Sequence, residues 1–134
     1  MWPYFIDTWF FVAQFDPFDS HHRQALRLER AVGSADLISH DGVLTEFLAA
    51  VSRGDEEQRA AAVRIVRDVM RRMTVVEADR RLFSRAVDLY GKRLDKHYSL
   101  VDCMSMLVMR DLGLTHILTN DHHFQQEGFV LVNE

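Results

Sequence analysis

The sequence contains one cysteine, six glycines and two prolines among 134 residues, and these scarcities exclude several classes of protein. The single thiol, Cys103, cannot form a disulfide within the chain. It lies in an apolar helical pattern, and a buried thiol suits a reducing compartment, so we expect a cytoplasmic protein. No glycine belongs to a G-x-G-x-x-G or phosphate-loop pattern, which removes the main support for dinucleotide-binding or NTP-hydrolysing proteins.

The aromatic N-terminal stretch, residues 1–15, lacks a basic first region and a small-residue cleavage site. It is too short to span a bilayer and carries Asp7 in its middle. We therefore expect a buried strand followed by a helix, and no association with a membrane. The net charge of −4 argues against strong non-specific binding of nucleic acid, although it permits a local groove that binds RNA with the help of cations.

Short apolar runs alternate with longer amphipathic segments along the chain, without a linker or repeat. We expect Ser20 and Asp41 to cap two of the helices. The alternation predicts one α/β domain over residues 1–134, a three-layer α/β/α sandwich with a central parallel sheet of four or five strands. The expected strands are 4–6, 37–40, 73–76, 116–119 and 129–132, and the expected helices are 9–15, 20–32, 41–53, 55–70, 79–90, 99–112 and 121–126.

Four acidic residues occupy similar local positions on different predicted elements. Asp7 ends the first strand, and Asp121 follows the fourth. Glu46 and Asp102 each lie in the first turns of a helix. The carboxyl ends of parallel strands share one edge of the sheet, and the crevice where the strand order reverses is the default ligand site. The four carboxylates therefore converge if the first and fourth strands are neighbours.

Clustered carboxylates repel one another in an apolar setting, so this arrangement needs a cation. Oxygen ligands completed by water favour Mg²⁺ or Mn²⁺ over Zn²⁺. Such an ion lowers the pKa of a bound water and neutralises charge on a phosphate, which points to phosphodiester hydrolysis.

Each acid also has a purely structural explanation. Asp102 completes the capping-box pattern Ser99-x-x-Asp102, Asp121 fits an N-cap or turn, and Glu46 fits a solvated helix position. Asp7 is the hardest to explain in this way, because a carboxylate at the end of a buried strand is unfavourable unless it is paired or liganded. Spacing alone leaves the choice open.

Five segments, taken in order, resemble the PIN domain and specifically its VapC-like toxins, and together they cover essentially the whole chain. They are Phe5-Ile6-Asp7-Thr8, Asp19-Ser20-His21-His22, Val43-Leu44-Thr45-Glu46-Phe47-Leu48, Ser99-Leu100-Val101-Asp102-Cys103 and Leu118-Thr119-Asn120-Asp121-His122-His123-Phe124. The chain departs from many relatives at Trp9, where they have Ser or Asn, and at His97, where close relatives often have an acid.

The resemblance implies an endoribonuclease that uses Mg²⁺ or Mn²⁺, with Asp7, Glu46, Asp102 and Asp121 as its catalytic and metal-binding residues. It also implies a homodimer, a cognate antitoxin and an RNA substrate. Asp95 is left out of the site because it is expected in a loop between helices.

Two other classes of function remain. One is a PIN-fold binding or regulatory module with weak or lost nuclease activity, against which the retention of all four acids speaks. The other is a phosphatase or receiver-type protein with an aspartate nucleophile, for which the sequence lacks a D-x-D or lysine signal.

Two further patterns lead to weaker expectations. The adjacent histidines His122 and His123 do not predict zinc, because neighbours on a helix point in different directions; one of them is a candidate substrate contact beside Asp121. The aromatic run Trp9-Phe10-Phe11 exceeds what a small core needs, so we expect a partner to cover part of it.

Overall fold

A computed structural model describes residues 2–134 of the chain and contains a five-stranded parallel sheet. The strand order is β3-β2-β1-β4-β5, so the first strand lies at the centre, between β2 and β4. The strands are β1 (Tyr4–Ile6), β2 (Leu37–His40), β3 (Thr74–Val76), β4 (His116–Leu118) and β5 (Val130–Val132). The expected parallel sheet, and the expected adjacency of the first and fourth strands, are confirmed.

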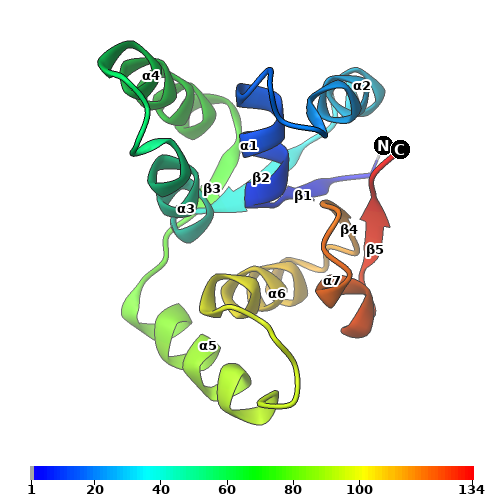
Figure 1. Ribbon diagram of the computed structural model, residues 1–134. Helices are drawn as coiled ribbons and strands as arrows, with labels where there is room; N and C mark the ends of the chain where they lie inside the picture. The colour runs from blue at the N-terminus through cyan, green and yellow to red at the C-terminus, as the bar shows by residue number, and fades with distance from the viewer. Residues whose placement is uncertain (1) are drawn as a thin grey trace.

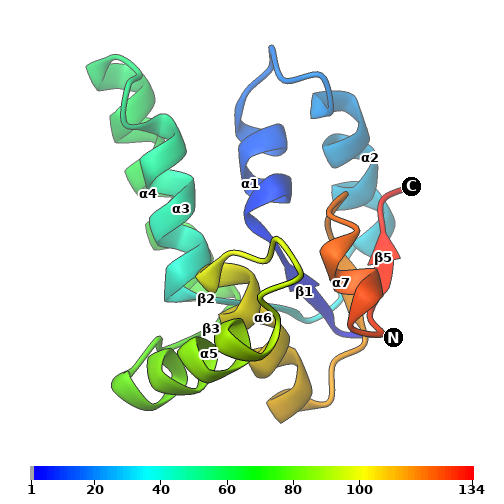
Figure 2. The ribbon, with the colours of Figure 1, turned by 60° about the horizontal axis from the view of Figure 1, so that its bottom comes forward.

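Within residues 2–134, seven helices cover the two faces of the sheet (Figures 1 and 2). The chain passes from β1 through β2 to the edge strand β3, and then from β4 to the edge strand β5 on the opposite side. Right-handed crossovers therefore put the two groups of helices on opposite faces. One layer holds α1 (Thr8–Phe15), α2 (His22–Val32), α3 (Asp41–Val51) and α4 (Glu56–Arg72), and the other holds α5 (Arg80–Lys92), α6 (Leu100–Leu112) and α7 (His123–Gln126). This is the three-layer α/β/α sandwich that the sequence predicts.

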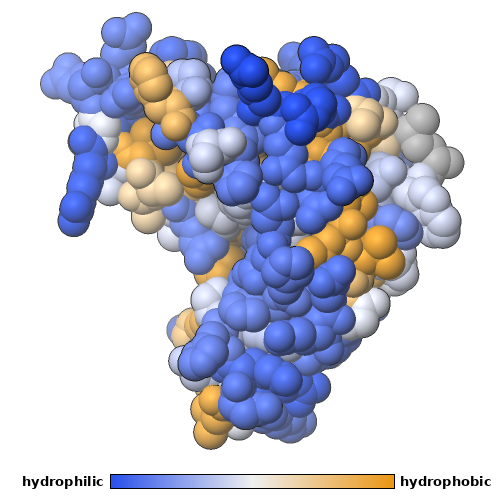
Figure 3. All heavy atoms as spheres, turned by 45° about the vertical axis from the view of Figure 1, so that its right-hand side comes forward, coloured by the Kyte–Doolittle hydropathy of each residue, from blue (hydrophilic) through white to orange (hydrophobic). Residues whose placement is uncertain are grey.

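The core forms where the apolar central strand meets the helices of both layers. Phe5 and Ile6 of β1 are fully buried, and so is Cys103, as expected for its thiol. Phe10 and Phe11 are also buried, at 3% and 2% exposure, so the chain itself covers them. Trp9 is only half-buried, and its coverage by a partner stays a prediction. The face of the molecule shown in Figure 3 is mostly hydrophilic, with apolar side chains gathered in separate patches. Within residues 2–134, no helix is both long and apolar enough to cross a membrane.

Two expected helix caps are wrong. Residue His21, not Ser20, is the N-cap of α2. Helix α3 begins at Asp41, and its N-cap is His40, whose Nδ1 accepts a hydrogen bond from Gly42 N at 3.0 Å. The imidazole supplies the acceptor that a shorter polar side chain normally provides. A Cβ on Gly42 would lie 2.8 Å from the His40 ring, so this cap depends on the glycine.

Candidate active site

The sheet brings Asp7 and Asp121 to the same edge because β1 and β4 are parallel neighbours. Asp7 directly follows β1, and Asp121 lies three residues after the end of β4. Along the chain, β2 and β3 lie on one side of β1, whereas β4 and β5 lie on its other side. The strand order therefore reverses between β1 and β4. This is the location at which open parallel sheets form ligand crevices.

The buried carboxylate of Asp7 does not cap the helix that follows it, α1. Asp7 occupies the N-cap position of α1, yet its side chain caps no backbone N–H there. Instead Oδ2 accepts a hydrogen bond of 2.7 Å from the hydroxyl of Thr119, which follows β4. The side chain is almost fully covered, with 6% of the residue exposed. The expectation that structural roles explain Asp7 poorly agrees with this geometry.

Asp102 has a structural role in addition to its place at this edge. It forms a capping box with Ser99 at the start of α6, with both hydrogen bonds at 3.0 Å, one of them to Asp102 Oδ2. Its Oδ1 accepts no hydrogen bond from a protein group within residues 2–134. The structural explanation of Asp102 is therefore correct but incomplete, since one oxygen remains available.

Asp121 shapes the turn that leads into α7. Its Oδ1 accepts a hydrogen bond of 2.9 Å from His123 N, and its own N–H donates to Thr119 Oγ1 at 3.1 Å. Thr119 Oγ1 thus joins the loop of Asp121 to the carboxylate of Asp7. This hydroxyl holds the two acids in a fixed relation.

Glu46 lies on α3 and approaches the other acids from that helix. Its Oε1 accepts a hydrogen bond of 2.5 Å from Thr8 Oγ1, in the first turn of α1. Since Thr8 adjoins Asp7 in the chain, this bond orients Glu46 with respect to the strand end. The half-buried position of Glu46 does not agree with a purely solvated role.

One histidine completes the cluster. His123 Nδ1 lies 3.2 Å from Asp121 Oδ1 and 3.5 Å from Asp102 Oδ2. One possible ligand atom from each of these three residues lies within 4.8 Å of the other two. Asp7 and Glu46 lie outside this compact group, but the negative charge of Asp102 acts on both of them.

The cluster carries unbalanced negative charge. Burial raises the pKa of Asp7 from 3.8 to about 7, and the charges of Asp102 and Asp121 act in the same direction, against the hydrogen bond from Thr119. Burial also raises the pKa of Glu46 and of Asp102, and the nearest carboxylate adds to each effect. Within residues 2–134, no lysine or arginine forms an ion pair with any of the four acids.

These properties fit a divalent cation. Carboxylates that share a partly dry site without cationic side chains either take up a proton, as the raised pKa of Asp7 indicates, or stay ionised with a bound cation that compensates their charge. The buried His123 Nδ1, which lacks a hydrogen-bond partner, gives a second sign that a group belongs among these residues. Oxygen donors dominate the set, which suits ions such as Mg²⁺ or Mn²⁺.

The sequence pattern did not assign roles to the two threonines, and it left open which of His122 and His123 lies beside Asp121. Thr8 and Thr119 stand beside acids in the Asp7-Thr8 and Thr119-x-Asp121 motifs, and this adjacency was the available signal. Asp95 lies in the loop between α5 and α6, with its side chain 76% exposed and paired with Lys96, as expected.

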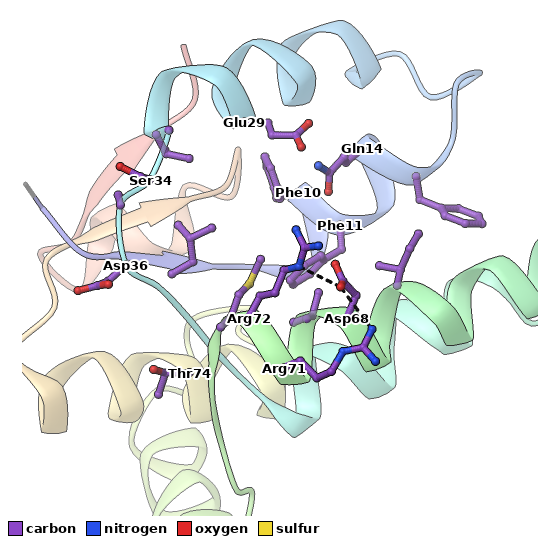
Figure 4. A pocket seen from close by; sticks show the side chains of 18 of the residues that line it. Phe10, Phe11, Gln14, Glu29, Ser34, Asp36, Asp68, Arg71, Arg72 and Thr74 are labelled. Atoms are coloured by element: carbon purple, nitrogen blue, oxygen red, sulfur yellow. Dashed lines mark hydrogen bonds and ion pairs between the residues drawn. The ribbon is translucent and has the colours of Figure 1, made fainter.

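A cavity of about 1060 Å³ lies away from the acids (Figure 4). It opens between α1, α2 and α4, near the amino ends of β2 and β3, whereas ligand crevices form at the carboxyl ends. Three of its charged side chains pair with one another, since Asp68 accepts from Arg71 and Arg72 at 3.5 and 3.0 Å. Chemistry, rather than volume, therefore locates the candidate site.

Comparisons with known proteins identify the family of the chain. The model of the PIN domain family matches residues 4–129, a range that contains all four acids. No curated protein sequence matches the chain. Among solved structures, the chain is similar to VapC20 of Mycobacterium tuberculosis, a toxin that cleaves the sarcin–ricin loop. The two share 25% identity with a TM-score of 0.84, over 97% of this chain and 98% of VapC20.

Two more distant structures share the fold. VapBC2 of Rickettsia felis, bound to a DNA fragment from its promoter, matches with 15% identity and a TM-score of 0.71 over 98% of each chain. FitAcB of Neisseria gonorrhoeae matches with 12% identity and a TM-score of 0.72 over 96% of each chain. The family match and the shared architecture extend along nearly the entire sequence, and the chain therefore belongs to the PIN domain family, with a VapC-like fold.

Proposed function

We propose that this protein is a metal-dependent endoribonuclease that hydrolyses RNA phosphodiester bonds and acts as the toxin of a toxin–antitoxin pair. The observation that carries the proposal is a group of acids without a lysine or arginine partner in residues 2–134, at the reversal point of the sheet. Asp102 and Asp121 lie together with His123, and Asp7 and Glu46 are close enough for the charge of Asp102 to act on them. Asp7, Glu46, Asp102 and Asp121 would hold Mg²⁺ or Mn²⁺ directly or through water.

The chain's own residues fix the geometry of such a site. Thr119 holds the carboxylate of Asp7, Thr8 holds that of Glu46, and the capping box holds Asp102. A bound divalent cation supplies an activated water and neutralises charge on the scissile phosphate. Preorganised ligands of this kind raise the rate because no reorganisation is needed during the reaction.

The substrate and the partners are inferred from the relatives. VapC20 cleaves the sarcin–ricin loop, which supports RNA as the substrate class. The VapBC2 and FitAcB assemblies have the same fold, which supports a cognate antitoxin as a partner. We further propose a homodimer that acts in the cytoplasm. Helix α5 exposes an apolar stripe suited to a protein contact: Phe83, Val87 and Tyr90, which are 40%, 46% and 46% exposed.

Cleavage of a set of labelled structured RNAs tests the enzymatic proposal. We expect cleavage with Mg²⁺ or Mn²⁺, none with EDTA, and a loss of about 100-fold or more in Asp7→Asn, because a direct ligand is removed. Asp95→Asn is the matched control, since it removes an exposed aspartate outside the site. RNA binding without cleavage by the wild type would instead favour a binding module.

Induced expression in bacteria tests the toxin role separately. We expect growth arrest with the wild type and normal growth with Asp7→Asn at equal protein levels. An active nuclease that does not arrest growth would overturn the toxin role and leave the nuclease proposal intact.

A further inference from the structure

The imidazole of His123 lies among carboxylates at distances that a shared cation would produce. Its Nδ1 is 3.2 Å from Asp121 Oδ1 and 3.5 Å from Asp102 Oδ2. Two ligands at adjacent corners of an octahedron, each about 2.1 Å from the ion, lie about 3 Å apart. Within residues 2–134, these three residues are the one group of His, Cys, Asp or Glu whose ligand atoms gather this closely.

The same nitrogen has no other partner. His123 Nδ1 is inaccessible to solvent and forms no hydrogen bond, although two carboxylate oxygens are close to it. A buried polar atom without a partner is unfavourable by about 1–3 kcal/mol. An ion located between the nitrogen and the oxygens removes this penalty without moving the ring.

A buried network keeps the ring in this position. The Tyr98 ring packs against His123 with 5.1 Å between the ring centroids, and its hydroxyl donates to Glu127 Oε2 at 2.9 Å. Glu127, with a side chain that is 6% exposed, also accepts from Arg93 and Arg110 at 3.0 and 2.8 Å. Partners behind a metal-binding side chain orient it and strengthen its binding.

We propose that His123 is a nitrogen ligand, through Nδ1, of the cation held by Asp102 and Asp121, and that it biases the site toward Mn²⁺ over Mg²⁺. The proposal rests on the proposed function for the presence of a cation. Mg²⁺ is bound in proteins by oxygen ligands and water, whereas imidazole nitrogen strengthens the binding of first-row transition ions. The neighbouring His122 has no such position, since it is exposed and its Nδ1 lies 3.0 Å from Gln125 Oε1.

The two adjacent histidines provide a matched pair of variants, His123→Gln and His122→Gln. Titration calorimetry on the full chain, with Mn²⁺ alone and with Mg²⁺ alone, measures the two affinities. Pulsed electron paramagnetic resonance on the Mn²⁺-loaded protein detects coupling to a bound ¹⁴N nucleus. A third variant, His123→Phe, keeps an aromatic ring against Tyr98 and controls for the loss of packing.

We expect nitrogen coupling in the wild type and in His122→Gln, and none in His123→Gln or His123→Phe. We also expect the Mn²⁺ affinity to fall about tenfold or more in both His123 variants, with a clearly smaller change for Mg²⁺. A wild type that binds Mn²⁺ without nitrogen coupling would overturn the role of His123 alone, as would equal losses for the two ions. A wild type that binds neither ion at millimolar concentration would instead overturn the metal site of the proposed function.

Discussion

Replacing Asp7 by Asn should stabilise the metal-free protein while abolishing its activity. The Asp7 carboxylate is buried beside Asp102 and Asp121, and its pKa rises from 3.8 to about 7. A change of this size corresponds to about 4 kcal/mol of penalty on the ionised form in the folded state. Asn has nearly the same shape, and its side-chain carbonyl can still accept the hydrogen bond from Thr119.

The sign follows from proton binding. Between pH 3.8 and about 7, the folded state holds the Asp7 proton more often than the unfolded state does, so this group lowers the stability as pH rises through that window. The advantage of Asp7→Asn should therefore be close to zero near pH 4 and reach about 2–4 kcal/mol above pH 7. Urea unfolding in EDTA at a series of pH values measures it, with Asp95→Asn as the exposed control.

Adding Mn²⁺ or Mg²⁺ should reverse the order of stability at pH 8. An ion at 1,000 times its dissociation constant stabilises the wild type by about 4.1 kcal/mol, which exceeds the advantage of the variant, and the variant should gain much less. The reasoning about Asp7 is refuted if Asp7→Asn is the less stable protein at pH 8 in EDTA, or if the difference between the proteins does not change with pH.

Three further changes test residues around the site. Burial lowers the pKa of His40 from 6.5 to about 4, so the folded state takes up this proton less readily than the unfolded state. The test uses Asp7→Asn, because the titration of Asp7 would oppose that of His40 over the same pH range. The free energy of unfolding of this variant should fall by about 3 kcal/mol between pH 6.5 and pH 4. Urea titrations that show no change with pH would contradict a buried neutral imidazole. Gly42→Ala should lower the free energy of unfolding by about 1–3 kcal/mol, because its Cβ meets the His40 ring; an unchanged thermal midpoint would show that the ring moves freely. Glu127→Gln should lower the free energy of unfolding by about 1–3 kcal/mol, since the substitution weakens the bonds to Arg93 and Arg110. The same variant should bind Mn²⁺ more weakly in calorimetry. Both effects must appear if the network positions His123.

The order of strands and helices was predictable because it depends on patterns that act over a few residues. An apolar run that ends in an acid marked β1 and Asp7, and the alternation of short and long segments implied a parallel sheet. The N-cap of α3 was not predictable in this way. Histidine is a rare cap, and His40 serves as one because Gly42 leaves room for its ring, a contact that involves packing rather than propensity.

The site residues show a different limit. The pattern Ser99-x-x-Asp102 is equally consistent with a helix cap and with a site residue. The structure shows the cap, which uses one oxygen of Asp102, and among the described residues it leaves the other oxygen free for the proposed site. The local sequence pattern therefore does not distinguish a capping role of Asp102 from a site role. His122 and His123 were also equivalent in sequence, and the turn at Asp121 decides which ring faces the acids.

The position of Asp7 links the fold and the proposed chemistry. The strand that ends in Asp7 is the most central one in the sheet, where a carboxylate lowers stability the most and where Asn would satisfy the same hydrogen bond. A protein selected for stability alone has no reason to keep an acid at this point. Folded proteins retain such unfavourable groups where function needs them, because the ligand supplies the missing interaction. The proposed cation would give Asp7 and the unpartnered nitrogen of His123 the same explanation, since each is unfavourable in the protein alone and each would be compensated by the ion.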